Sequence, residues 1–417
     1  MSVSINHEIQ MLYANAFTKL LANLTSYASG DLGKAEDALQ DAFIKALTKW
    51  PKDGLPPNPA GWIFTTAKRK LIDGARHKQV ENRKQSELKV LAKDRQRLYE
   101  ETTTFEADNL PDQRLELLFT CCHPLLSAEG QVAITLQVFS GMNIETIARA
   151  LMVTNSTMAK RLTRAKTKIR NAKIAFELPA KPDYENRLEV ILQVIYLIFN
   201  EGYLPKEGAS LLKQSLCDEA IELGSLLNQL YSKRADVMAL LALMLFSHSR
   251  RKARLDADGQ LVTLEGQDRQ LWDTQMIEKA SQLLDAALTL NALGEYQIQA
   301  AIAALHAKAP RYEKTDWRQI ALLYERLLRL NDRPVVRLSH AVAIAMALGP
   351  EPALALLDKL EQDNSLKTYH LFYSAKAEIL AMSAKISEAT ANFEHAISIC
   401  ENKIEKSHMQ RRLTALK

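Results

Sequence analysis

The chain has 417 residues, with 54 Lys and Arg against 49 Asp and Glu and a formal net charge of +5. It holds no apolar run of about 18 residues, and its first ten residues lack the basic start and apolar stretch of a secretory signal, so we expect neither a membrane span nor a signal peptide. The cysteines show no disulfide spacing, which favours a reduced, cytoplasmic protein.

Apolar residues recur mostly at helical spacing, so we predict an all-α protein that begins with a small domain at residues 1–78. Three prolines and two glycines in Lys52–Gly61 predict a break between two helices. The helix before the break, Ala35–Trp50, has an acidic first half made of Glu36, Asp37 and Asp41. These carboxylates form either an ordinary solvated face or a docking face for a basic partner.

The helix after the break, Trp62–Lys78, combines aromatic with basic residues. Such a mixture suits a single strand or a melted duplex, because bases stack on aromatic rings while phosphates pair with cations. In the alternative, Trp62 and Phe64 are core residues and the basic side chains are merely solvated. The basic residues are Lys68, Arg69, Lys70, Arg76 and Lys78.

Residues 79–110 are highly charged and poor in apolar spacing, which predicts a linker to a second small domain at 111–178. Within that domain we expect helices at Leu115–Leu126 and Gln131–Phe139. The run Asn143–Arg170 then predicts two short helices joined by a tight turn, a helix-turn-helix whose second helix enters a DNA major groove. Met152 stands in the turn, where many such motifs have glycine.

The second helix of this motif has a distinct assignment for each face. Thr154 is placed to cap it, and Met158, Leu162 and Ala165 face the core. Five polar residues face outward, where they reach base edges or phosphates: Asn155, Ser156, Lys160, Arg161 and Arg164. From Ala159 to Lys173 there are seven Lys or Arg and no acid. The alternative is an ordinary helical hairpin with a solvated basic face.

The charge of the whole chain supports the DNA interpretation. Residues 1–180 carry 25 basic and 19 acidic residues, a net of +6, and residues 181–417 carry the remaining 29 and 30, a net of −1. This distribution indicates a polyanionic partner for the N-terminal part alone.

Residues 183–417 predict a helical domain in which helices pair as in a tetratricopeptide-like solenoid, with Arg251–Asp273 as one irregular or hairpin-like insert. Two stretches, 56 residues apart, carry the repeat spacing, with small residues where paired helices approach closely. They comprise Trp317, Ile320, Ala321 and Tyr324 in the first, and Tyr373, Ala377, Ala389, Phe393 and Ala396 in the second.

We expect no metal, no cofactor and no catalytic residues. Cys121–Cys122–His123 lacks the second ligand pair of a structural zinc site, so these cysteines should pack as small apolar side chains, and Cys217 and Cys400 are isolated in the sequence. Asp256–Gln260 lacks the further ligands and terminal Glu of a calcium loop. No phosphate-binding glycine loop, nucleophile elbow or catalytic carboxylate pair is present in the sequence.

The ordered set of helices resembles regions 2 and 4 of the bacterial extracytoplasmic-function (ECF) sigma factors, over about residues 8–175. Further strings resemble the subgroup with a long tetratricopeptide-like C-terminal extension, and with them the resemblance covers nearly the whole chain: Leu117–Ser127, Leu197–Tyr203, Asp256–Asp273, Tyr296–Ala307 and Thr315–Trp317.

This resemblance implies a promoter-specificity subunit that binds core RNA polymerase, through its β′ clamp and β flap, and promoter DNA. Glu36, Asp37 and Asp41 would dock on the β′ clamp. The loop Lys52–Gly61, with Asn58, would capture a flipped base of the minus-ten element, and Trp62, Lys68, Arg69 and Arg76 would hold this melted strand. The five outward residues of the helix-turn-helix would read the minus-thirty-five element.

The near-neutral C-terminal domain would regulate in cis, with Leu197–Gly208 and Arg251–Asp273 either as interface or sensing segments or as structural caps. One alternative function is a stand-alone DNA-binding regulator whose solenoid binds a ligand or a protein. Another is a helical scaffold that never contacts DNA. The stand-alone regulator differs from a sigma factor in the acidic docking helix, which only a sigma factor needs. The scaffold predicts no salt-dependent binding to DNA.

Overall fold

The structure is a computed structural model that describes residues 2–82, 112–141, 143–151, 153–179, 181–203 and 214–416. Within these ranges the chain is helical apart from turns, short 3-10 segments and an isolated antiparallel bridge between Leu255 and Leu261, which confirms the all-α prediction. It forms two compact units, 1–194 and 195–417. None of the described helices combines the length and the apolar character that a bilayer span needs.

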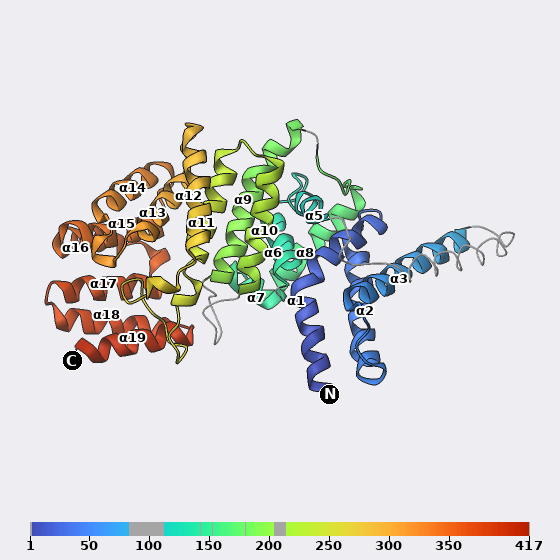
Figure 1. Cartoon of the computed structure of the whole chain (residues 1–417), viewed down its shortest axis with the longest axis horizontal. Coiled ribbons are helices and arrows are strands. Elements are labelled where there is room, and N and C mark those ends of the chain that lie inside the picture. Colours follow the sequence, from blue (N-terminus) through green and yellow to red (C-terminus); the bar gives the residue numbers. More distant parts are fainter. Residues whose placement is uncertain are drawn as a thin grey trace. The chain divides into compact units, whose positions relative to one another are not determined.

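The first unit contains two groups of helices (Figure 1). Helices α1 to α3 pack on one another, and α5 to α8 follow. Of the predicted linker, only the part up to Asn82 lies within the described residues. The bounds are α1 Ser2–Tyr27, α2 Leu32–Asp53, α3 Pro59–Asn82, α5 Arg114–Cys121, α6 Ala128–Ser140, α7 Ile144–Ala150 and α8 Asn155–Asn171.

Local caps explain where α2 and α3 begin and end. The Asp31 carboxylate accepts a hydrogen bond from the Lys34 amide at 3.2 Å and starts α2. Gly54, with φ of +86°, ends the helix three residues after Pro51, and Asn58 starts α3 by accepting from the Gly61 amide at 2.8 Å. The predicted break at Lys52–Gly61 is therefore confirmed.

The helix-turn-helix forms where the sequence predicts it, as α7 and α8. Thr154 Oγ1 accepts a hydrogen bond from the Thr157 amide at 3.2 Å, which confirms its role as the cap of α8. Met158, Leu162 and Ala165 are at most 4% exposed and face the core of this domain, as predicted. Met152 lies outside the described residues.

The second unit is a succession of packed helices, which begins within α9 (Lys181–Tyr203) because the division between the units falls inside that helix. Its further bounds are α10 Gln214–Leu230, α11 Ala235–His248, α12 Thr274–Thr289, α13 Glu295–Lys308, α14 Trp317–Leu330, α15 Pro334–Leu348, α16 Pro350–Leu360, α17 His370–Met382, α18 Ile386–Ile399 and α19 Lys403–Leu416.

Neighbouring helices of this unit pack in pairs, α14 on α15 and α17 on α18. Four of the predicted contact residues of the second pair are fully buried: Ala377, Ala389, Phe393 and Ala396. Small side chains thus stand where α17 and α18 approach each other, while the tetratricopeptide assignment itself stays a prediction.

The irregular insert Arg251–Asp273 forms a hairpin-like connection between α11 and α12. Asp256 Oδ1 accepts hydrogen bonds from the amides of Asp258 and Gln260, and Gly259 has a φ of +72°. This carboxylate therefore stabilises a tight turn. The buried Arg254 donates to the Tyr203 carbonyl and stacks its guanidinium 3.9 Å from the Tyr203 ring. These contacts favour the structural-cap interpretation of the insert.

Candidate nucleic-acid interface

The outward face of α8 is polar and cationic. Asn155, Ser156, Lys160 and Arg164 are exposed and Arg161 is partly exposed, while the buried residues of the helix lie on the opposite side. All five predicted outward residues are therefore accessible, as a DNA-reading helix requires.

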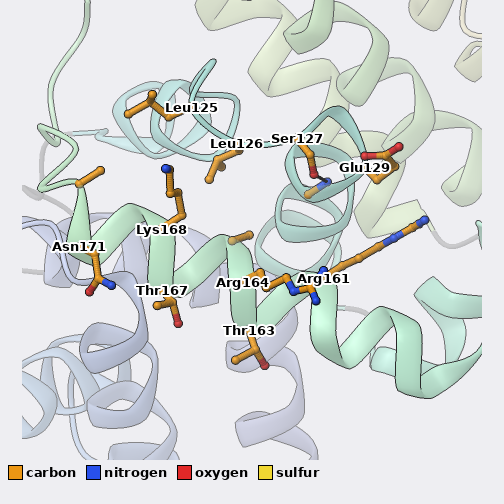
Figure 2. Close-up of a pocket in the computed structure, with 13 residues that line it drawn as sticks. Leu125, Leu126, Ser127, Glu129, Arg161, Thr163, Arg164, Thr167, Lys168 and Asn171 are labelled. Atoms are coloured by element: carbon orange, nitrogen blue, oxygen red, sulfur yellow. Dashed lines mark hydrogen bonds between the residues drawn. The ribbon is translucent and has the colours of Figure 1, made fainter.

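A pocket of about 830 Å³ lies beside this face (Figure 2). Figure 2 shows Arg161, Arg164 and Lys168 on α8 and the segment Leu125–Glu129 across from them. Ser127 caps α6 here by accepting from the Gly130 amide at 3.2 Å, so the positive end of the α6 dipole opens into the same pocket. Three cations against the single acid Glu129 make the pocket suited to phosphate groups.

One part of this surface follows from the sequence and one does not. Lys168, one of the seven basic residues between Ala159 and Lys173, follows Arg161 and Arg164 at i+7 and i+4, so helical spacing places it on the same face. The Leu125–Gly130 segment gave no comparable signal, because its approach to α8 depends on how α6 packs against that helix.

The basic stripe of α8 is not wholly directed at an external anion. Lys166 Nζ lies 2.5 Å from Glu36 Oε2 of α2, and the two side chains are 24% and 13% exposed. Two further contacts join the same helix groups: Thr18 Oγ1 donates to the Val138 carbonyl at 3.4 Å, and a Cβ on Gly30 would lie 3.1 Å from the Ile174 carbonyl oxygen. Lys166, one of the seven basic residues between Ala159 and Lys173, is therefore paired with a carboxylate of the same chain.

The two aromatic residues of α3 have different environments. Phe64 is 1% exposed and packs edge-on against Tyr27 with ring centroids 5.9 Å apart, so it belongs to the core of the first domain. Trp62 is partly exposed and meets Trp50 edge-on at 5.4 Å. Only Trp62 thus keeps surface on which a base could stack.

The other predicted strand-binding residues lie before α3 and along it. Asn58 precedes the helix and is exposed, although its side chain already caps α3. Lys68 holds its ammonium 4.5 Å from the centre of the Tyr27 ring, and Arg69 is partly exposed. Arg76 lies in α3, but its side chain is outside the described residues.

The three predicted docking carboxylates of α2 differ in their contacts. Asp37 is exposed, Asp41 forms an ion pair with Lys70 of α3, and Glu36 pairs with Lys166. Both partners lie far away in the sequence, so the spacing along α2 gave no sign of them. Two of the three carboxylates are already neutralised within the chain.

The adjacent cysteines of this unit are packing residues. Burial, the largest influence, raises the pKa of the Cys121 thiol well above its usual value, and it raises that of Cys122 to about 12 although Thr135 hydrogen-bonds the sulfur. Both are at most 1% exposed. The prediction that they pack as small apolar side chains is confirmed.

Comparisons with known proteins cover most of the chain. The family model for sigma-70 region 2 matches residues 13–80, that for ECF sigma factors matches 61–174, and that for a family of unknown function matches 187–288. The chain is also 40% identical over 386 residues to an uncharacterised protein of Rhizobium meliloti (strain 1021), which is 93% of this chain and 90% of that protein. No solved structure matches the chain.

Proposed function

The chain belongs to the ECF sigma factors, the promoter-specificity subunits of bacterial RNA polymerase, with an additional helical part at its C-terminus, and we propose which of its surfaces bind promoter DNA and which bind the polymerase. Sigma factors are generally not enzymes; the polymerase supplies the chemistry. The protein should therefore act in the cytoplasm, where polymerase and promoter DNA meet.

We propose that α8 reads the minus-thirty-five element as duplex. Arg161, Arg164 and Lys160 are long, cationic and accessible, and Asn155 stands with Ser156 at the start of the helix. Arginine recognises guanine and asparagine recognises adenine through paired hydrogen bonds in the major groove. The cationic pocket beside α8 supports contacts to the flanking phosphates, which fix the register of the helix on the duplex.

The melted minus-ten strand is assigned to the end of the α2–α3 loop and the start of α3. Holding a base outside the stack costs a few kcal/mol, which pocket and stacking contacts must repay. The partly exposed ring of Trp62 offers the stacking surface, with Asn58 before it and the cations Lys68, Arg69 and Arg76 after it for the phosphates. The burial of Phe64 removes that residue from the strand-binding set.

The acidic face of α2 is the proposed docking site for the β′ clamp, and the second domain is proposed to contact the β flap. Asp37 is exposed and thus available in the described conformation. Glu36 instead forms an ion pair with Lys166, which joins the docking helix α2 to the DNA-reading helix α8 in what we call the closed arrangement. We propose that this closed arrangement opens when polymerase competes for Glu36. The C-terminal part would regulate in cis.

Polymerase binding by single variants tests the docking assignment. Asp37→Lys should weaken the affinity for core polymerase. Lys166→Ala should strengthen it about threefold to tenfold, because losing the partly buried ion-pair partner of Glu36 disfavours the closed arrangement by roughly 1 kcal/mol. Affinity is measured by titration of labelled protein with core polymerase without DNA. Lys168→Ala, on the same helix, serves as the matched control and should change little.

Two outcomes would contradict this account. Equal affinities for Asp37→Lys and the unchanged protein would remove α2 as the docking face. An affinity of Lys166→Ala at or below that of Lys168→Ala would mean that the ion pair does not hold the two domains closed. A stand-alone DNA-binding regulator predicts no polymerase binding by any of these proteins.

A further inference from the structure

Three side chains with metal-binding atoms meet in the second unit, far from the DNA-facing surface in sequence. His370 is the first residue of α17, Cys400 follows the end of α18, and Glu405 lies in the first turn of α19. Their ligand atoms all lie within 4.8 Å of one another, the one such convergence among the residues that the structure describes. The helix pairing of this unit, not any sequence motif, brings them together.

The distances are close to those of a metal site. His370 Nε2 lies 3.0 Å from Glu405 Oε2. Bonds of 2.0–2.3 Å in a tetrahedral zinc site place neighbouring ligand atoms roughly 3.3–3.8 Å apart. Small rotations of these side chains would therefore be enough to surround an ion. Three protein ligands leave the fourth position for water, a pattern known for zinc sites with open coordination.

The surroundings hold the ligands in place and leave access. Cys400 is 5% exposed and donates from Sγ to the Asn402 carbonyl at 3.5 Å. The Asn402 side chain accepts from the amides of Ile404 and Glu405 at 3.0 and 3.2 Å and thereby fixes the start of α19. The His370 and Glu405 side chains remain 20% and 16% exposed, so an ion can reach them from solvent.

The charge balance permits an exchange of protons for a metal ion. Burial lowers the pKa of His370, but hydrogen bonds with Cys400 and Glu405 and their charges outweigh this and raise it to about 9, so the imidazole is cationic at neutral pH. A bound metal ion requires a neutral imidazole and a thiolate, so the ion competes with protons for these ligands and its affinity should rise with pH. Glu405 also interacts electrostatically with two basic groups, Arg254 and His408.

We propose that His370, Cys400 and Glu405 bind a divalent transition-metal ion of the zinc type, which ties α17 to the start of α19. The ligand set combines imidazole, thiolate and carboxylate, which favours zinc over magnesium or calcium. This inference goes beyond the proposed function, and its test involves neither DNA nor polymerase. The competing interpretation is an ion pair of imidazolium and carboxylate with a neighbouring thiol and no metal.

The test is a titration of the full-length, reduced protein with Co²⁺ and with Zn²⁺. We expect one equivalent of Co²⁺ to bind with a thiolate-to-cobalt charge-transfer band and with release of protons, Zn²⁺ to displace it and abolish the band, and Zn²⁺ added to the metal-free protein to raise the thermal unfolding temperature. Cys400→Ser should lose the band and bind at least roughly 100-fold more weakly. Cys217→Ser, which removes another buried cysteine of the same unit, is the matched control and should keep the band.

Several results would overturn the proposal. If the unchanged protein shows no charge-transfer band at a tenfold excess of Co²⁺, only the ion pair remains. The same conclusion follows if Cys400→Ser keeps the band or if Cys217→Ser loses it. Since Cys400→Ser could fail to fold, Glu405→Gln provides a second variant that keeps shape and hydrogen bonding. Its Co²⁺ affinity should also fall, and an affinity equal to that of the unchanged protein would exclude Glu405 as a ligand.

Discussion

Replacing Arg161 and Arg164 together with alanine should abolish promoter-dependent transcription while core polymerase still binds. Each arginine that pairs with a base edge contributes about 1–3 kcal/mol of discrimination, so losing both should reduce output at least roughly 30-fold at a promoter that depends on its minus-thirty-five element. Both side chains lie on the accessible face of α8, outside its packed side, so the fold should tolerate the change. The measurement is multiple-round transcription with purified core polymerase, beside polymerase titration of the same variant.

Arg329→Ala provides the control for this variant. Arg329 is an exposed arginine of α14, with 75% of its side chain accessible and an ion pair to Glu325 one turn away. Its loss should leave transcription unchanged. If the Arg161 and Arg164 variant transcribed normally, or if it lost polymerase binding instead, α8 would not be the duplex reader. A shallower salt dependence with unchanged sequence preference would assign these arginines to phosphates rather than to bases.

Phe64→Ala should destabilise the first domain by about 3–5 kcal/mol, because it empties a fully buried site in a packed helical core. Phe64 is 1% exposed and contacts Tyr27 edge-on, so its removal leaves a cavity that neighbouring helices cannot fill without shifting. Urea unfolding, followed through the tryptophans of this domain, measures the loss as a lower midpoint. Transcription should fall only because less protein is folded.

Trp62→Ala is the matched comparison, since it removes the neighbouring aromatic residue. Its ring is partly exposed, so the loss of stability should be smaller than for Phe64→Ala. Binding to a forked DNA with an unpaired minus-ten strand should weaken by about 1–3 kcal/mol, the usual contribution of one stacked base. If Trp62→Ala unfolded as readily as Phe64→Ala and bound the fork normally, Trp62 would be a core residue and the strand-binding assignment would fail.

The parts of the fold that the sequence predicts correctly depend on local physics. The cap at Thr154, the buried face of α8 and the break before α3 follow from side chains within a few residues of one another. Helical periodicity also places the five outward residues of α8 without knowledge of the neighbouring helices. Such features need no tertiary information, because a helix determines its own faces.

The parts that sequence reasoning missed depend on contacts between distant segments. Lys166 and Glu36 are 130 residues apart, and no spacing rule relates them. Periodicity could not separate Phe64 from Trp62, because the packing of the neighbouring helices decides which of the two is covered, and it buries Phe64 beside Tyr27. Cys400 stands alone in the sequence, and its neighbours His370 and Glu405 are set by the packing of α17, α18 and α19.

The central claim is that this chain directs polymerase to promoters, and run-off transcription with core polymerase tests it most directly. Templates are taken from start sites mapped after overexpression of the full-length protein. We predict discrete transcripts that need both the protein and a template with two separated promoter elements, and that disappear when either element is scrambled. Transcripts equally abundant without the protein, or no promoter-dependent product at any mapped site although it binds those sites as duplex, would contradict the account and favour a stand-alone DNA-binding regulator.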